Sequence, residues 1–510
     1  MTTRPGSGPV ARSPVSLRPD PTRVIGQLFL PGHALAGERG GRASRLVAHV
    51  LELSETDVTV AVDDLVMRFG ERHRGLAGMI EQHAQRLANR LAPGVELSAG
   101  QRLLLGATFT HEYAIEAASV CNPSAVAAAD QRDVAPGALR FVMSVRQIGE
   151  GHRSSIGFRT GVLGHDGRFS IDPRTPFTTT GTVEDVTLDA HLFSELGPDV
   201  DADAVRWVLD HLGPSFTSRR LHERLHELET QGDTRRDVAQ TVSRFIERES
   251  RCYATHFPAS SGVDERVLVP SSVAESMGLE DARFVRFVDD DATVTYYATY
   301  TAYDGSAIAQ QLLATADFLS FTSSPVLGAA AANKGLALFP RRIGGDLYAL
   351  TRHDGATNGI SKSADIRHWP ASVPLDVADA MWSSVQVGNC GSPIELDEGW
   401  LVLTHGVGPM RTYSIGGLLL DLEDPTVVIA QTKEPLLAPR PDEQDGYVPN
   451  VVYSCGALRH GGTILVPYGI ADTRIGFATF STAGLLAAMG VGHDTSDHGR
   501  PLDQEVTPHA

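Results

Sequence analysis

Short runs in which apolar and polar residues alternate recur through most of the chain, and Gly, Asp, Asn or Pro bounds each run. Examples are "LRFVMSVRQ", "TVTYYATYTAY", "GWLVLTHGV" and "TILVPYGIA". Alternation of this kind is typical of β-strands that bury one face, and the bounding residues favour turns. A chain built from such runs is mainly β, and its sheets must cover one another to form a core.

A faint internal repeat arranges these strands into similar units. The segments "LLATADFLSFTSSPVL" and "GISKSADIRHWPASVPL" share a pattern of small residues, Ala-Asp and an aromatic residue, and their aspartates lie roughly 50 residues apart. Two further segments follow a looser version of the same scheme. A period of this length in β sequence indicates propeller blades, each of which packs against its neighbours. We therefore predict a five-bladed β-propeller over residues 137–483.

Two segments with helical periodicity interrupt the β pattern. "DDLVMRFGERHRGLAGMIEQHAQRLANRL", at residues 63–91, carries apolar residues at spacings of mostly three and four. A second block of this kind occupies about 200–250, between Gly and Pro turn signals. We expect a largely helical N-terminal extension over residues 1–136, a helical insertion within the propeller, and a disordered polar tail over 484–510.

The charge and the absence of certain patterns exclude several classes of protein. The net charge is −18, and the acidic residues are spread along the chain, which argues against nucleic acid or an anionic membrane as a partner. No apolar run approaches the roughly 20 residues of a membrane helix, so we expect a cytoplasmic protein. The four cysteines lie far apart and lack CxxC spacing, so we expect no disulfide, and we expect no metal and no cofactor.

Polar residues interrupt the alternation at the ends of several predicted strands, where a propeller would bring them into one central pocket. The stretches are "NPS" at Asn122, "GEGHRSS", "GLEDAR", "TAYDG", "NKG", "THGVGPMRTYSIGG", "DGYVPNVV" and "YGIADTRIG". The acidic pair Glu280 and Asp281 in "GLEDAR" taken alone would more often cap a turn. Similar polar stretches fall in other predicted blades, and this favours a functional site over a turn cap.

Together these stretches resemble glycoside hydrolase family 130, the inverting β-mannoside phosphorylases and mannosidases. "GLEDAR" is similar to the family pattern G-x-E-D-P-R, with Ala282 in place of proline. "TYTAYDG", "GWLVLTHGV", "YSIGGLLLDLEDP", "YVPNVVYSCG" and "YGIADTRIGFA" are similar to further family blocks in the same order. The segment "THEYAIEAASVCNPSAV" with "GEGHRSSIGFRTG" resembles a longer branch of the family.

The resemblance implies roles for residues on both sides of a bound sugar. Asp281 would be the general acid and would pass its proton through a hydroxyl of the mannose, and Asp472 would hold a sugar hydroxyl. A proton donor of this kind needs a raised pKa. Further substrate contacts are expected from Glu280, Arg283, Asp304 and Asn450.

The identity of the nucleophile, phosphate or water, distinguishes a phosphorylase from a hydrolase. A phosphorylase must bind phosphate through several cations or donors, whereas a hydrolase needs one carboxylate to activate water. His405 and Tyr413 match family positions that line the phosphate site. Gln386 stands where phosphorylases usually have lysine, and Gln310 or Gln311 where an arginine is expected. Arg146, His152 and Arg153 would compensate as phosphate ligands.

Several carboxylates are candidates for the base of a hydrolase. Glu150, Glu395 and Glu443 cannot be ranked by spacing. Glu112 and Glu116 are four residues apart in "HEYAIEAA", which favours an ordinary pair on a helix surface.

We predict an enzyme that cleaves β-mannosides with inversion, with phosphorolysis to mannose 1-phosphate favoured and inorganic phosphate as cosubstrate. The alternatives are an inverting β-mannosidase and a noncatalytic sugar-binding propeller. The expected partner is a small β-mannoside, and the sequence leaves a homo-oligomer open.

Overall fold

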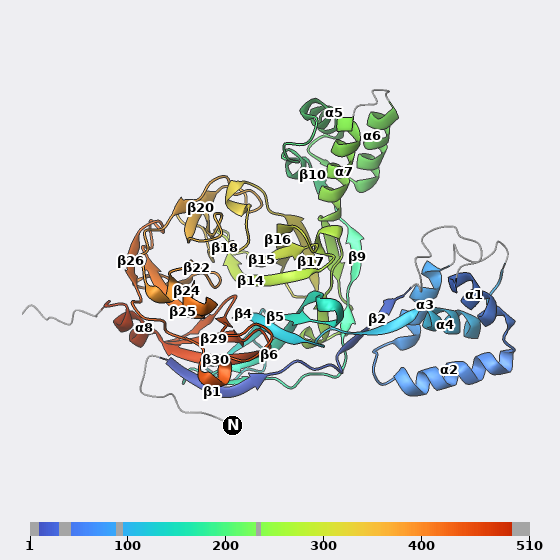
Figure 1. Cartoon of the computed structure of the whole chain (residues 1–510), viewed down its shortest axis with the longest axis horizontal. Coiled ribbons are helices and arrows are strands. Elements are labelled where there is room, and N and C mark those ends of the chain that lie inside the picture. The colour runs from blue at the N-terminus through green and yellow to red at the C-terminus, as the bar shows by residue number, and fades with distance from the viewer. Residues whose placement is uncertain (1–9, 30–41, 88–94, 231–235, 492–510) are drawn as a thin grey trace, which may run out of the picture.

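The computed structural model describes residues 10–29, 42–87, 95–230 and 236–491. These ranges contain eight α-helices and thirty strands, so the chain is mainly β with helical additions. Figure 1 shows a rounded body of sheets from which two helical lobes project, one formed by α1–α4 and the other by α5–α7. In the described residues no helix is both long and apolar enough to span a membrane.

The body is made of five successive groups of antiparallel strands. The first contains β4 (Ser119–Ala127), β5 (Leu139–Ile148), β6 (Ser154–Leu163) and β7 (Phe169–Ile171). The second contains β14 (Gly278–Val288), β15 (Val294–Tyr303), β16 (Ile308–Thr315) and β17 (Ser320–Pro325). The third contains β18 (Ala337–Leu338), β19 (Leu347–Thr351), β20 (Gly359–Ser363) and β21 (Val373–Pro374).

The last two groups each have five strands. The fourth contains β22 (Gln386–Asn389), β23 (Ile394–Leu396), β24 (Gly399–Val407), β25 (Tyr413–Leu420) and β26 (Val428–Gln431). The fifth contains β27 (Val452–Tyr453), β28 (Leu458–His460), β29 (Thr463–Ile470), β30 (Arg474–Ser481) and β1 (Val10–Leu17). Every residue of β24 is buried, because neighbouring groups cover both of its faces.

Each group contacts the next, and the fifth contacts the first. The contacts are Phe284 N to Ser124 Oγ (3.0 Å), Val288 N to Pro340 O (2.9 Å), Val387 N to Ala356 O (2.9 Å), Tyr413 N to Asn450 O (2.9 Å) and a parallel bridge between Ser124 and Gly456. The first two groups are also joined where β6 pairs with β14. The opening strands β4 and β14 and the chain near Gly456 therefore lie side by side.

The strand pairing crosses the domain boundaries expected from the sequence. β1 and β4 both lie within the predicted N-terminal extension, residues 1–136, yet β1 pairs with β30 and β4 pairs with β5. The predicted tail likewise begins inside α8 (Thr482–Ala488), whose Leu485 and Leu486 are buried in the core of the fifth group. The rest of that tail, from 492, lies outside the described residues.

The N-terminal lobe is carried on a two-stranded ribbon, β2 (Val24–Leu28) and β3 (Thr110–Ala114), which leads away from the body (Figure 1). Its helices are α1 (Arg42–Glu52), α2 (Glu55–Phe69), α3 (Leu76–Arg86) and α4 (Ala99–Thr108). Ser54 caps α2, and Ser98 forms a capping box with Gln101 at the start of α4. The apolar sides of α1 and α4 form a small core with Leu87 and Phe109.

The second lobe contains α5 (Ala202–Leu212), α6 (Ser218–Thr230) and α7 (Arg236–Ser250), within the region for which the sequence predicts an insertion. Asp201 caps α5, and Gly213 ends it. Short strands surround the insertion: β8 (Thr179–Thr180), β9 (Thr182–Asp185), β10 (Leu188–Asp189), β11 (Ser215–Phe216), β12 (Tyr253–His256) and β13 (Arg266–Leu268). β12 pairs with β17, which attaches the lobe to the second group.

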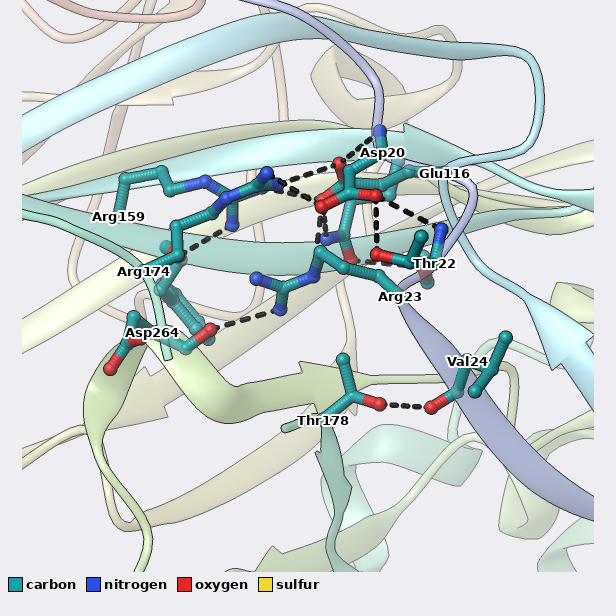
Figure 2. Close-up of polar contacts among 12 residues, drawn as sticks. Asp20, Thr22, Arg23, Val24, Glu116, Arg159, Arg174, Thr178 and Asp264 are labelled. Atoms are coloured by element: carbon teal, nitrogen blue, oxygen red, sulfur yellow. Dashed lines mark hydrogen bonds and ion pairs between the residues drawn. The ribbon is translucent and has the colours of Figure 1, made fainter. Parts of the chain in front are cut away.

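A buried cluster of charges holds the base of the ribbon against the first group (Figure 2). Glu116 is fully buried, and its carboxylate accepts hydrogen bonds from Arg159 (2.5 Å) and Gln147 (2.6 Å). Arg23 and Arg174 each lie 3.4 Å from the same carboxylate. The expected surface pair on a helix is therefore wrong, because Glu112 lies on a strand, β3, and Glu116 follows it into the interior.

Candidate active site

A bulge in β14 places two neighbouring carboxylates beside one guanidinium. The pairing of β14 with β15 shifts between Glu280 and Arg283, and Asp281 has a left-handed backbone with φ of +57°. Side chains of adjacent residues in a regular strand point to opposite faces, and a bulge changes this. Arg146 on β5 contacts both, at 2.5 Å from Glu280 and 3.5 Å from Asp281.

Asp281 is almost completely buried and has three polar neighbours. Asn122 donates a hydrogen bond to its carboxylate, and Arg283 lies 3.9 Å away. Burial alone would raise the pKa of Asp281, but Arg146, Arg283 and Lys334 outweigh burial and lower it to about 2. The sequence led us to expect a raised pKa at this position, so the pKa of Asp281 in the free protein differs from that expectation because three cations surround the carboxylate.

The pKa of Asp472 is shifted in the opposite direction from that of Asp281. It lies in a left-handed turn with Ala471, where both φ angles are +47°, and Ser119 donates to its carbonyl oxygen. Burial raises the pKa of Asp472 to about 6; Arg146 opposes this, whereas the negative charges of Asp281 and Glu280 add to it. Burial also raises the pKa of Glu280. Arg146 thus acts on all three carboxylates, yet the pKa of Asp281 is lowered while those of Asp472 and Glu280 are raised.

A second polar cluster lies on the other side of Arg283. Arg283 donates to the hydroxyl of Tyr453 (2.7 Å), and the ring of Tyr453 packs against His405 with ring centres 4.9 Å apart. Nη1 of Arg352 lies 2.9 Å from Nε2 of His405. A guanidinium can only donate, so Nε2 accepts and Nδ1 carries the proton.

His405 is therefore a neutral group. Burial lowers its pKa far below the ordinary value, and the charges of Arg352 and Arg283 lower it further. Gln386 lies 3.3 Å from Nε2 of His405, and Tyr413 stacks on the histidine ring at 6.2 Å. The positive charge in this cluster belongs to Arg352, at the end of β19, and not to His405.

The predicted residues His152 and Arg153 lie on an exposed loop between β5 and β6. The hydroxyl of Tyr447 contacts Nδ1 of His152 at 2.9 Å, which joins this loop to the segment before β27. The hydroxyl of Tyr113, on β3 of the ribbon, donates a hydrogen bond to the carbonyl of Glu150 in this loop (2.8 Å).

Two other predicted substrate ligands, Asp304 and Asn450, form hydrogen bonds with backbone groups of the chain. The carboxylate of Asp304 accepts from the backbone N–H groups of Ser306 and Ala307, both at 2.7 Å, and so caps the turn between β15 and β16. The backbone of Asn450 has φ of +63°, and its carbonyl accepts from Tyr413.

The candidate bases of a hydrolase have different surroundings. Glu395, on β23, forms an ion pair with Arg341 at 2.6 Å. Glu443 accepts hydrogen bonds from Arg12 and from Tyr468 (2.9 Å). Gln311, one of the two positions where an arginine is expected, accepts a hydrogen bond from Arg251 (3.0 Å). These side chains therefore bind other residues of the chain.

Tyr453 and Arg352 are polar groups of the site that were not predicted from the sequence, whereas Asn122, in the predicted stretch "NPS", contacts Asp281. Several buried polar atoms near the two clusters have no hydrogen-bond partner among the described residues: Asn122 Oδ1, Arg146 Nε, Arg283 Nε, Arg352 Nε, Asn389 Nδ2 and Asn389 Oδ1. Buried polar atoms are normally paired, so a concentration of unpaired ones indicates a place where a polar ligand binds. Position after an apolar strand, as in "LYALTRHDG", is the signal that could have identified Arg352.

Left-handed backbone is concentrated in the same region. Non-glycine residues with positive φ include Asn122 (+48°), His152 (+62°), Asp281, Asn450 and Asp472. Such conformations cost free energy and gather at functional sites. Within the described ranges, no group of three or more His, Cys, Asp or Glu residues could hold a metal ion.

Comparison with known proteins gives consistent results. The sequence model of glycoside hydrolase family 130, described as beta-1,4-mannooligosaccharide phosphorylase, matches residues 233–490. Beta-1,2-mannobiose phosphorylase of Listeria innocua is 33% identical over 237 residues, which cover 45% of this chain and 65% of that protein. The chain thus spans just under two thirds of that relative.

Two further proteins are similar over comparable lengths. A 1,2-beta-oligomannan phosphorylase of Thermoanaerobacter sp. is 37% identical over 221 residues, covering 42% of this chain and 72% of that protein. The solved structure of the Listeria innocua enzyme with β-1,2-mannobiose aligns with 73% of this chain and 92% of its own, at 23% identity and a TM-score of 0.44.

Proposed function

The chain belongs to glycoside hydrolase family 130, and from this membership we propose that it cleaves β-mannosidic linkages with inversion by phosphorolysis, releasing mannose 1-phosphate. The five strand groups would then be the blades of a five-bladed propeller, with the candidate site where their first strands begin. The named activities of the relatives and the unpaired polar atoms around Asp281 and Arg352 support this proposal.

In this proposal Asp281 is the residue that passes a proton to the leaving oxygen through a sugar hydroxyl. The pKa of about 2 means that Asp281 is ionised in the free protein at neutral pH. In this proposal the proton comes from a neighbour in the cluster, and Asp472, whose pKa burial raises to about 6, is the candidate donor. A bound sugar also displaces water from around the two carboxylates, which favours the protonated form.

Phosphate would bind on the side of Arg352. Its guanidinium is buried, is oriented by His405 and has an unpartnered Nε, so it can offer charge-assisted donors to an oxyanion. It supplies the positive charge that Gln386, in place of a lysine, does not. Tyr413 and the exposed Arg153 would complete the phosphate site.

A hydrolase remains the second candidate, favoured by Gln386 and by the absence of arginine at Gln310 and Gln311. Against it, Glu395 and Glu443 each form an ion pair with an arginine, and that of Glu443 is buried. Glu150 is exposed and is the candidate base that this alternative would use. A noncatalytic sugar-binding role would leave the strained acidic bulge without a purpose.

Incubation with β-1,2- and β-1,4-mannobiose, with and without inorganic phosphate, tests the proposal. We expect mannose 1-phosphate and one free mannose only when phosphate is present. Release of two free mannose molecules at the same rate in phosphate-free buffer would establish the hydrolase, and no cleavage in either buffer would leave a binding protein.

A further inference from the structure

A cavity of about 330 Å³ lies at the opposite ends of the strands that begin at the candidate active site. It is lined by residues from all five strand groups, including Ala127, Val288, Pro340, Ile394 and Leu458. Cavities of this size accommodate small molecules. Arg286 lines it five residues after Asp281 on β14, so the two lie roughly 15 Å apart along the strand.

This cavity does not share its lining with the candidate active site. Its lining contains none of Arg146, Asp281, Arg352 and Asp472. Phe284, between Asp281 and Arg286 on β14, is buried, and its N–H donates to Ser124. A ligand in the cavity would therefore not contact Asp281.

The cavity wall is cationic although the protein is strongly acidic. The charged residues in its lining are Arg286, Arg341, Arg459 and Glu395, which leaves an excess of two positive charges. Glu395 binds Arg341 through its carboxylate and Arg459 through its carbonyl (2.6 Å). These contacts hold the two guanidiniums in place at the wall.

Two more features favour a ligand over an empty surface hollow. The hydroxyl of Ser392 is buried, lines the cavity and has no partner among the described residues. Arg341 stacks on the ring of Trp400 with 4.9 Å to the ring centre, so its position is fixed by packing as well as by charge. The rest of the wall is apolar and suits the carbon faces of a small organic body.

We propose that this cavity is a second binding site that takes a small phosphate monoester of about the size of a hexose phosphate. A phosphate monoester carries close to two negative charges at neutral pH, which matches the excess of two guanidiniums. Arginine suits such a ligand because its planar fork makes two bonds to phosphate oxygens. The ester's carbon body packs on the apolar wall.

Binding calorimetry on the full chain tests this site with three probes: α-mannose 1-phosphate, inorganic phosphate and mannose. The variants are Arg286→Gln, the double variant Arg286→Gln/Arg459→Gln, and Arg352→Ala at the candidate active site. Arg342→Gln is the matched control, because Arg342 neighbours Arg341 but pairs with Asp289 at 2.8 Å and does not line the cavity.

We expect Arg286→Gln to weaken one class of mannose 1-phosphate site by about tenfold or more, and the double variant to remove it. Arg342→Gln should bind as the wild type does. Inorganic phosphate should bind this site at least tenfold more weakly than the ester, and mannose should not bind it measurably.

Unchanged binding in both cavity variants would overturn the second site, and equal affinity for inorganic phosphate would overturn the assignment to an ester. Because Arg286 is exposed, Arg286→Gln should not disturb folding and gives a result even if the double variant is unstable. Failure of the proposed function would appear separately, as the absence of mannose 1-phosphate when mannobiose is incubated with inorganic phosphate, whereas unchanged binding in Arg352→Ala would place the active-site phosphate elsewhere.

Discussion

At the scale of single residues, burial and one shared guanidinium together shift the pKa values of three carboxylates. Arg146 lies against Glu280 and Asp281 and also opposes the rise that burial causes in the pKa of Asp472. Since Asp281 has the stronger cationic surroundings, its pKa falls to about 2 while that of Asp472 rises to about 6. Separation of pKa values among neighbouring carboxylates is how acid and base roles are assigned in enzymes.

Replacement of Asp281 tests the acid position. We expect Asp281→Asn to lower kcat by about 100-fold or more, since an amide fills the same space but cannot transfer a proton. Thermal unfolding should show that the variant is folded, and Asp291→Asn, in an exposed turn, should retain activity. Turnover equal to that of the wild type would make Asp281 a structural residue.

The pH dependence of kcat/KM tests the source of the proton. A general acid must be protonated to act, so kcat/KM should fall as the pH rises through about 6, the pKa of Asp472 in the free protein. Asp472→Asn should abolish this inflection. A decrease on the acidic side of pH 6 instead would mean that Asp472 is needed as an anion.

The phosphate side is tested by comparing a buried arginine with an exposed one. Arg352→Ala should raise the KM for phosphate by about tenfold or more, because it removes an oriented charge. Arg153→Ala should raise it less, because a charge on an exposed loop is screened by solvent. Equal KM values for phosphate in the wild type and Arg352→Ala would place the phosphate elsewhere.

At the scale of elements, the ribbon and its helices are joined to the sheets by buried charge. Glu116 is surrounded by Arg23, Arg159 and Arg174 (Figure 2), and the next strand, β4, leads directly to Asn122. Gln147, which donates to Glu116, is adjacent to Arg146 on β5. The cluster thus fixes the strands that present two site residues.

Loss of this carboxylate should be costly. We expect Glu116→Ala to lower the free energy of unfolding by about 3–5 kcal/mol, because it leaves buried guanidiniums without their partner. Asp64→Ala, which removes an exposed pair with Arg68 on α2, should change it by about 0.5 kcal/mol or less. Urea unfolding of both variants measures the difference, and similar small effects would show that the cluster does not hold the ribbon.

At the scale of the whole molecule, the N-terminal segment belongs to the last sheet as well as to the first lobe. Deletion of residues 1–100 would remove β1 and β2, leaving β30 with an unpaired edge and β3 without its partner. We expect aggregation of this truncation, measured as the soluble fraction after expression. A soluble and fully active truncation would show that the extension is a detachable module.

The sequence predicted those parts of the fold that depend on local pattern. It indicated the alternating strands and the helices near 63–91 and 200–250, and it located the carboxylates of β14 and of the turn before β30. It could not show that Arg352, just after β19, meets His405 on β24, because the two belong to different strand groups. The burial of Glu116 and the low pKa of Asp281 likewise depend on charges brought together by tertiary contacts.

The pairing of β1 with β30 has a consequence for synthesis on the ribosome. Val10 is opposite Phe480, so the first described strand is translated long before the strand that it pairs with. At ordinary translation rates the delay is roughly half a minute to a minute and a half. During that time β1 has no partner and must remain accessible, so any nascent-chain partner or bulky fusion that occupies the amino terminus would delay completion of the last sheet.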